Sequence, residues 1–253
     1  LNMIDQDIAK TDQIIQKTEE LKQGMMRELL TKGIGHKKFI KSSIGEMPAD
    51  WVLGKIQDIV NLGDKNAIQP GPFGSSLKKS FFVKFGYKVY GQEQVISGNH
   101  KIGNYYIDQS KFNQMKMFSI KNGDVLISLV GTIGQVLIVT NEWEKGIINP
   151  RLLKISPNKD KMRSSYLAYL LKSKLIRNQL DKISHGGTMN VLNGKNLKSL
   201  NFGIPPLNEQ GKIISTLNAF DEKLLLNEVI KNKLIALKNG LMQDIFSQKV
   251  QIN

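Results

Sequence analysis

Polar and cationic side chains that could contact a polyanion are gathered in a few glycine-containing loops. Residues 71–79 read Gly-Pro-Phe-Gly-Ser-Ser-Leu-Lys-Lys, which combines small residues, two hydroxyl groups and two cations. Glycine lets the backbone come close to a phosphate, and lysine supplies positive charge for it. We therefore expect a nucleic-acid-binding loop in which Lys78 and Lys79 contact phosphate and Ser75 and Ser76 lie beside it.

Other loops carry side chains that can read base edges. Residues 91–94, Gly-Gln-Glu-Gln, present two amides, the groups that pair bidentately with adenine. A solvated turn is the simpler interpretation of each loop taken alone, and the hypothesis depends on the whole set. We expect base contacts from Gln92, Gln94, Arg151, His185 and Thr188, with Asn149 as a further DNA-binding residue.

The net positive charge of the chain lies in its middle. The 253 residues contain 36 Lys and Arg and 22 Asp and Glu, a formal charge of +14. Residues 1–35 hold five basic and six acidic side chains, and residues 217–253 hold five and four, so residues 36–216 carry the whole excess. A chain that is merely lysine-rich would spread the charge, so the pattern favours a nucleic-acid-binding surface in the middle.

The sequence lacks the patterns of an enzyme active site. It contains no cysteine, which excludes thiolate metal sites and a cysteine nucleophile. The histidines, His36, His100 and His185, are far apart, with no carboxylate cluster at ligand spacing. Residues 149–152 lack the second proline and the aromatic residue of an amino-methyltransferase loop that holds a flipped base. We expect no catalytic site, no metal and no cofactor.

One helical segment occurs twice and brackets the charged middle. At an offset of 216 positions, residues 1–26 match residues 217–242 at nine positions, including Asp5 with Asp221 and Lys22 with Lys238. Both copies lack proline and place apolar residues at helical spacing. We expect two long antiparallel helices whose seams face each other. The predicted seam residues are Ile4, Ile8, Ile14, Leu21 and Met25 on the first helix and Leu224, Ile230, Leu234, Leu237 and Leu241 on the second.

The middle alternates short β-type runs with turns. Residues 125–130 and 135–139, joined by Gly-Thr-Ile-Gly, predict a hairpin, and one internal helix is expected to begin at Ser164–Ser165. Residues 44–51 indicate a linker into a new domain. The fold class is α+β, with one mixed α/β domain flanked by two long helices. The expected domains are 1–35, repeat helix; 36–216, mixed domain with linker; and 217–253, second repeat helix.

The sequence has neither the pattern of a signal peptide nor that of a membrane span. Charges interrupt the first 30 residues, and no run of 18 apolar residues occurs. We expect neither a signal peptide nor a membrane span, and a cytoplasmic protein.

The chain resembles the DNA-specificity subunits of type I restriction-modification systems. Ile204-Pro-Pro-Leu-Asn-Glu-Gln210 is similar to the exit into that family's long helix and is the most specific stretch. Residues 44–51, 71–78 and 90–94 resemble its domain entry and early loops, residues 121–126 with 131–134 its central hairpin, and residues 185–192 its closing loop. The family implies two target-recognition domains separated by two long helices. This chain has one domain between two helices, so we infer a half-subunit or a fragment.

The resemblance implies a non-catalytic subunit that reads one half-site of double-stranded DNA and docks modification and restriction subunits; a homodimer is a further possibility. Two other interpretations stay open. The chain could be the DNA-recognition part of a nuclease or methyltransferase, or a helical adaptor whose basic middle binds another protein.

Overall fold

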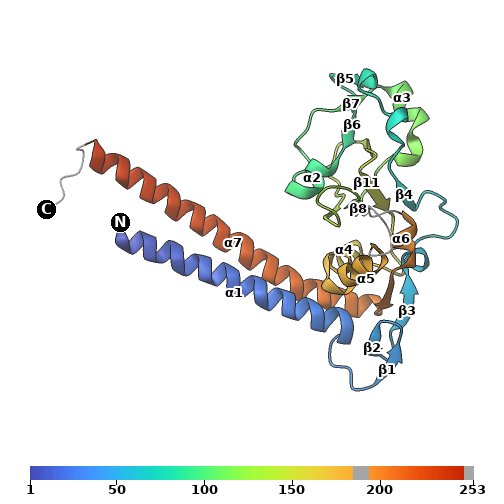
Figure 1. The fold of residues 1–253 in the computed structure, drawn as a ribbon, viewed down its shortest axis with the longest axis horizontal. Helices are drawn as coiled ribbons and strands as arrows, with labels where there is room; N and C mark the ends of the chain where they lie inside the picture. Colours follow the sequence, from blue (N-terminus) through green and yellow to red (C-terminus); the bar gives the residue numbers. More distant parts are fainter. Residues whose placement is uncertain (185–193, 248–253) are drawn as a thin grey trace. The chain divides into compact units, whose positions relative to one another are not determined.

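The computed structural model describes residues 1–184 and 194–247. The chain forms two compact units: a helical unit of residues 1–28 and 214–253, and a mixed unit of residues 29–213 (Figure 1). No helix in the described part of the chain is long and apolar enough to cross a membrane.

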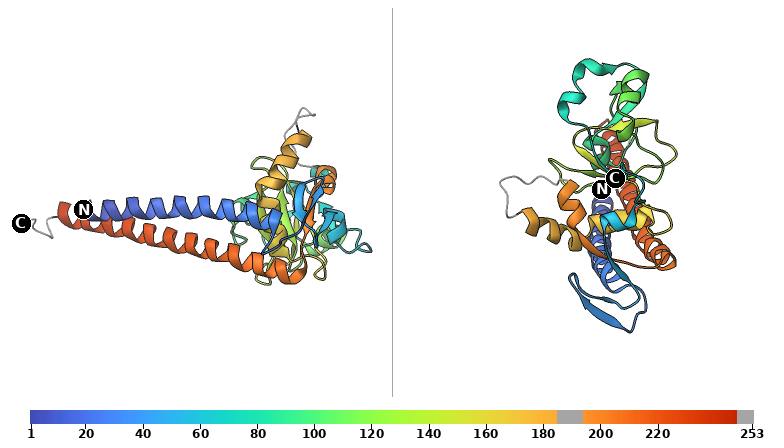
Figure 2. Two further views of the ribbon diagram at one scale, coloured as in Figure 1. Left: turned by 90° about the horizontal axis from the view of Figure 1, so that it is seen from below. Right: turned by 90° about the vertical axis from the view of Figure 1, so that its right-hand side faces the viewer.

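The helical unit is an antiparallel pair, as the sequence predicts. It consists of α1 (Asn2–Lys32) and α7 (Leu207–Phe246), which lie side by side in Figures 1 and 2. Ion pairs join Asp5 to Lys238 at 2.6 Å and Asp12 to Lys231 at 2.6 Å, and Lys22 also pairs with Asp221. Successive ion pairs lie 7 and then 10 residues later in α1, and 7 and then 10 residues earlier in α7. The register is therefore fixed along the whole unit.

Part of the predicted seam is wrong. Ile4, Ile8, Leu224 and Leu234 are partly buried as expected. The other six predicted residues are exposed: Ile14, Leu21, Met25, Ile230, Leu237 and Leu241.

The α1 seam instead uses Thr11, Ile15 and Thr18, which are all buried. The two threonine hydroxyls donate to the carbonyl oxygens of Asp7 and Ile14, each at 2.7 Å, so their burial leaves no unpaired donor. A threonine whose hydroxyl is satisfied in this way can occupy a seam position. The pattern of apolar residues alone therefore predicts a neighbouring stripe of the helix.

The mixed unit begins with a hairpin where the sequence suggested a linker. Strand β1 (Phe39–Ser42) pairs antiparallel with β2 (Gly45–Pro48), and β3 (Val52–Lys55) pairs antiparallel with β12 (Asn201–Ile204). Gly45 has φ +102°, a conformation that suits the tight β1–β2 turn. The glycine and proline in this segment mark a turn and a strand end.

A central antiparallel sheet has the strand order β4-β11-β8-β9. Its strands are β4 (Ile68–Pro70), β8 (Val125–Ser128), β9 (Val136–Ile138) and β11 (Leu152–Ile155). The β8–β9 pair is the predicted hairpin. Every residue of β8 and β11 is buried, and α2 (Gln92–Ser97) and α4 (Ser164–Lys172) contact β8 and β9.

The second sheet has the order β10-β6-β7-β5 and contains one parallel pair. Strand β6 (Tyr87–Tyr90) runs parallel to β10 (Gly146–Ile148) and antiparallel to β7 (Tyr106–Ile107), which pairs with β5 (Phe82–Val83). Helix α3 (Gln109–Gln114) contributes Phe112, which packs with Val89 and Ile107 in a buried cluster. Because β6 and β10 are parallel, the loops that follow them leave the sheet at the same edge.

The expected internal helix is two helices. Helix α4 ends at Lys172, the Ser173 N–H donates to Leu170 O, and α5 (Lys174–Ser184) follows. Arg163 is the N-cap, and the Ser164 hydroxyl donates to Gly123 O instead of capping. The remaining elements are α6 (Gly194–Ser199) and the 3₁₀ turns η1 (Ile56–Ile59), η2 (Gly74–Ser76), η3 (Lys79–Phe81) and η4 (Lys116–Phe118).

Two polar side chains fix the start of α7 within the mixed unit. Glu209 is buried; its Oε1 accepts the Ile34 N–H at 2.9 Å, and its Oε2 accepts the Trp51 indole N–H at 2.9 Å. Gln210 is fully buried, and its amide accepts from Arg163 N and donates to the carbonyl oxygens of Lys161 and Pro205. The Glu-Gln pair thus ties the first turn of α7 to three other segments of the mixed unit.

Candidate nucleic-acid interface

Loops that are distant in the sequence meet where β6 and β10 end. Gly91 and Gln92 follow β6, and Asn149 follows β10; the Asn149 N–H donates to Tyr90 O at 2.8 Å. A Cβ built on Gly91 would lie 2.6 Å from Asn149 Nδ2, so the two loops are in contact. The parallel strand pair thereby brings the predicted 91–94 loop beside the predicted Asn149–Arg151 segment.

The loop after β4 joins the same place. Gly71 donates its N–H to Leu152 O at 2.8 Å, and a Cβ on Gly71 would lie 1.8 Å from Asn149 O. That distance is far below any van der Waals contact, so the close approach of the two backbones requires glycine at position 71.

The turn of the β8–β9 hairpin is the fourth member. Gly131 has φ +67°, and a Cβ there would lie 3.0 Å from Gln92 Nε2. The Ser128 hydroxyl donates to Thr132 O at 2.6 Å and accepts the Gln135 N–H at 3.0 Å, which holds the turn. We call the 71–79, 91–92, 131–134 and 149–151 segments together the convergent loops.

The predicted phosphate-binding residues are all exposed. Ser75, Ser76, Lys78 and Lys79 each lie on the surface of the mixed unit, in or beside the short turns η2 and η3. Arg151 is exposed as well. Its backbone N–H donates to Asn149 Oδ1 at 2.9 Å, which fixes the Asn149 side chain. These cations are therefore available to a ligand.

Residues 91–94 are not a loop as expected: Gly91 is the N-cap of α2, and the two glutamines lie in its first turn, where they differ. Gln92 is half-buried, and its Oε1 has no hydrogen-bond partner within the described part of the chain. An unpaired buried acceptor costs about 1–3 kcal/mol, so this oxygen favours any ligand or loop movement that supplies a donor.

The predicted base contact of Gln94 is wrong, because this side chain lies inside the fold. It is fully buried, its Oε1 accepts the Gly91 N–H at 2.7 Å, and its Nε2 donates to Ile102 O at 2.8 Å. Both ends of the amide are engaged inside the fold, so Gln94 shapes the loop and has no group free for a base. His185 and Thr188 lie outside the described residues.

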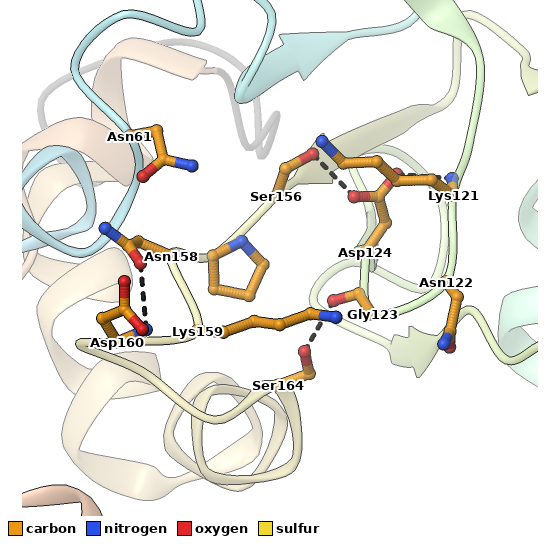
Figure 3. A pocket seen from close by; sticks show the side chains of 11 residues that line it. Asn61, Lys121, Asn122, Gly123, Asp124, Ser156, Asn158, Lys159, Asp160 and Ser164 are labelled. Atoms are coloured by element: carbon orange, nitrogen blue, oxygen red, sulfur yellow. Dashed lines mark hydrogen bonds between the residues drawn. The ribbon is translucent and has the colours of Figure 1, made fainter.

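A polar hollow of about 470 Å³ lies elsewhere in the mixed unit and was not predicted (Figure 3). Lys121 and Lys159 line it together with Asp124 and Asp160, so its two cations are offset by two carboxylates. Burial raises the pKa of Asp124, although the Ser156 hydroxyl, which donates to its Oδ1 at 2.6 Å, acts in the opposite direction. The hollow has no net charge that would select an anion, and we assign it no ligand.

A histidine and two carboxylates also lie together. His36, Asp50 and Glu209 bring ligand atoms within 4.8 Å of one another. His36 Nε2 is 2.7 Å from Glu209 Oε1, and its Nδ1 is 3.1 Å from Asp50 Oδ1. Both ring nitrogens already face a carboxylate, and both Glu209 oxygens accept hydrogen bonds. These three side chains already satisfy one another as structural contacts of the fold, and we assign no metal to the group.

Comparison with protein families identifies the family of the chain. Residues 48–236 match the family model described as "Type I restriction modification DNA specificity domain". The chain belongs to this family. The match includes all four convergent loops and most of α7, so it covers most of the mixed unit and the α7 part of the helical unit, but not α1.

Similar proteins are specificity subunits of archaea and bacteria. The domain is 28% identical over 253 residues to the putative type I restriction enzyme MjaX specificity subunit of Methanocaldococcus jannaschii, covering all of this chain and 56% of that protein. It is 22% identical to the EcoBI specificity subunit of Escherichia coli, covering 98% of this chain and 53% of that one. The chain thus spans a little over half the length of these relatives.

Solved structures show the same fold. The HsdS subunit of Thermoanaerobacter tengcongensis superposes with a TM-score of 0.65 at 16% identity, covering 96% of this chain and 54% of that chain. The S subunit from M. genitalium gives a TM-score of 0.57 at 13% identity, covering 95% and 57%. At these identities the similarity establishes the fold of the specificity domain.

Proposed function

We propose that the mixed unit reads one half-site of double-stranded DNA as the specificity component of a type I restriction-modification complex, without a catalytic role of its own. The observation that carries this proposal is the convergence of the four loops at the edge where β6 and β10 end. The loops belong to residues 36–216, which hold the whole excess of positive charge. A surface of several loops with exposed cations suits a duplex, which carries a phosphate about every 1.7 Å along its axis.

The convergent loops divide the work between phosphates and bases. Lys78 and Lys79 are exposed point charges suited to phosphates, with the Ser75 and Ser76 hydroxyls beside them. Arg151 and Gln92 carry the groups that pair bidentately with guanine and adenine. The unpaired Oε1 of Gln92 makes it the stronger base-reading candidate of the two glutamines. His185 and Thr188 stay in the proposal on their sequence context alone.

The helical unit supplies a docking surface for the modification subunit. Outside its seam each helix has a second apolar stripe, and the two stripes occupy equivalent positions of the repeat: Ile14, Leu21 and Met25 on α1, and Ile230, Leu237 and Leu241 on α7. Spacings of 7 and 4 suit a further helix packing along each stripe. The near-neutral charge of both ends suits a protein partner better than DNA. Contact with the restriction subunit would follow through the assembled complex.

Two rivals make different predictions. A piece of a nuclease or methyltransferase with its own active site would bind a methyl donor or cut DNA alone, and the sequence lacks the patterns for either. A helical adaptor that uses the basic unit to hold a protein would show no base-pair preference. A homodimer formed through the exposed stripes would exclude the modification subunit from them.

The proposal is tested by sequencing the methylated sites in cells that co-express this chain with its modification subunit. Changing Lys78 and Lys79 together to alanine should weaken binding to all duplexes alike and lower the salt slope by about 2, because two phosphate contacts are lost. Gln92→Ala should relax the methylated sequence at one base position, at a cost of about 1–3 kcal/mol for the correct base.

Gln94→Ala is not a suitable control, because that amide holds the loop together. Lys159→Ala is the matched control for the lysines, since Lys159 is exposed in the same unit but lies outside the convergent loops. A methylated site that stays the same after both Gln92→Ala and Arg151→Ala would place the reading surface elsewhere.

A further inference from the structure

Phe73 is the most conspicuous apolar side chain of the convergent loops. It is 88% exposed, although the same loop has a buried residue before it and another after it. Pro72 is buried, and Leu77 is buried in the cluster that contains Val89 and Ile107. The loop is therefore anchored at both ends while its aromatic ring is left in solvent.

The backbone between the anchors is ordered by its own hydrogen bonds. Phe73 is the N-cap of η2, with φ −61° and ψ 145°, and its carbonyl oxygen accepts the Ser76 N–H at 2.8 Å. The Leu77 N–H then donates to Gly74 O at 3.3 Å. Since a phenylalanine side chain has only two rotatable bonds, a ring on such a support loses little conformational entropy when it binds.

The position of Phe73 relates it to the proposed DNA surface. It lies two residues from Gly71, whose backbone touches Asn149 and Pro150, so its Cα is at most about 7 Å along the chain from that contact. On its other side follow the exposed hydroxyls and lysines of residues 75–79.

Other exposed phenylalanines lack this combination. Lys111 Nζ lies 3.9 Å from the ring centroid of Phe81, so that ring already has a partner within the fold. Phe85 is 85% exposed, like Phe73, but it lies in the turn between β5 and β6, outside the convergent loops.

We propose that Phe73 is a specificity-determining residue that makes an apolar contact with the bases of the DNA half-site, against a thymine methyl group or between two base steps. This inference rests on the proposed function. Phosphate contacts position the protein but carry no sequence information, whereas a ring that touches bases changes the preference among sequences. Phe73 is therefore expected to affect discrimination and to leave the salt dependence unchanged.

The experiment uses the complex of the full chain with its modification subunit, and a duplex that contains the site methylated by the wild-type complex. Phe73→Ala should lower affinity for this duplex about 10- to 100-fold, as expected for loss of a base contact, with an unchanged salt slope and unchanged affinity for a random duplex. Phe73→Leu should recover part of the loss. Phe85→Ala, matched in residue type and exposure, should behave as wild type.

The inference is overturned if Phe73→Ala binds the site as wild type does, if it weakens site and random duplex equally, or if Phe85→Ala gives the same loss. Circular dichroism and the melting temperature check that both variants are folded, which the exposure of both rings leads us to expect. A wild-type complex that methylates no defined site contradicts the proposed function instead, so the two failures are distinguishable.

Discussion

Asp124 shows how a single buried carboxylate can hold a turn and a sheet together. It is 1% exposed and immediately precedes β8; its Oδ2 accepts the Lys121 backbone N–H at 2.8 Å, and its Oδ1 accepts a hydrogen bond from the Ser156 hydroxyl at 2.6 Å (Figure 3). Burial raises the pKa of Asp124, and burial also lowers the pKa of the nearby Lys154. The carboxylate thus carries a desolvation penalty that its hydrogen bonds offset only in part.

The raised pKa has a definite consequence for stability. The folded protein binds the Asp124 proton more tightly than the unfolded chain, so this group's contribution to the free energy of unfolding is fully present below the ordinary carboxyl pKa and is lost as the pH rises through the raised folded value. Asp124→Asn should remove this dependence and change the free energy of unfolding at pH 7 by less than about 1 kcal/mol, since an amide can accept from Lys121 and donate to Ser156.

Asp124→Ala leaves the Lys121 N–H and the Ser156 hydroxyl without their acceptor and should cost about 2–4 kcal/mol. Urea denaturation of all three proteins between pH 4 and 8 provides the measurement. An asparagine variant as unstable as the alanine variant would mean that the charge itself is required.

At the scale of elements, the two long helices each have one apolar stripe in the seam and a second one that is exposed. Neighbouring isoleucines in α1 separate them: Ile15 is 8% exposed in the seam, and Ile14 is 43% exposed on the second stripe. Because consecutive residues of a helix point about 100° apart, the same substitution at the two positions tests different surfaces.

Ile15→Asp should destabilise the helical unit by about 2–5 kcal/mol, because it removes a buried side chain and buries a charge without a partner. Ile14→Asp should change stability by no more than about 0.5 kcal/mol and weaken binding of the modification subunit. Helical circular dichroism on heating gives the first quantity, and co-purification of the subunits gives the second. Equal loss of helix in both variants would mean that Ile14 also belongs to the seam.

The sequence predicted elements better than contacts between them. The β8–β9 hairpin follows from a local pattern of apolar residues and turns. The seam of α1 was missed because Thr11 and Thr18 look polar, whereas their hydroxyls are satisfied by the helix backbone. The polar loops were found from their composition, but their meeting at one edge depends on β6 pairing with β10 across 55 intervening residues (91–145), which no local pattern encodes.

At the scale of the whole molecule, the repeat imposes a local twofold symmetry on the helical unit. An offset of 216 turns Asp5 into Asp221 and Lys22 into Lys238, so the repeat exchanges the ion pair Asp5–Lys238 with the ion pair Lys22–Asp221. The second stripes are exchanged in the same way. An isologous arrangement of this kind presents the same surface twice, and two copies of one partner can bind it equivalently.

We therefore expect one specificity chain to bind two modification subunits, one on each second stripe. Leu21 and Leu237 are equivalent in the repeat and are 63% and 53% exposed, so an aspartate at either position should spare the seam and weaken one docking site by about 2–3 kcal/mol, the value of one buried leucine. Native mass spectrometry at micromolar concentration should show complexes with two modification subunits for wild type, one for Leu21→Asp and for Leu237→Asp, and none for the double variant. Leu62→Asp, at an 89% exposed leucine of the mixed unit, is the control and should retain two. Loss of both subunits from either single variant would contradict independent, equivalent sites, and a wild-type complex with a single modification subunit would show that the symmetry of the helices is not used for docking.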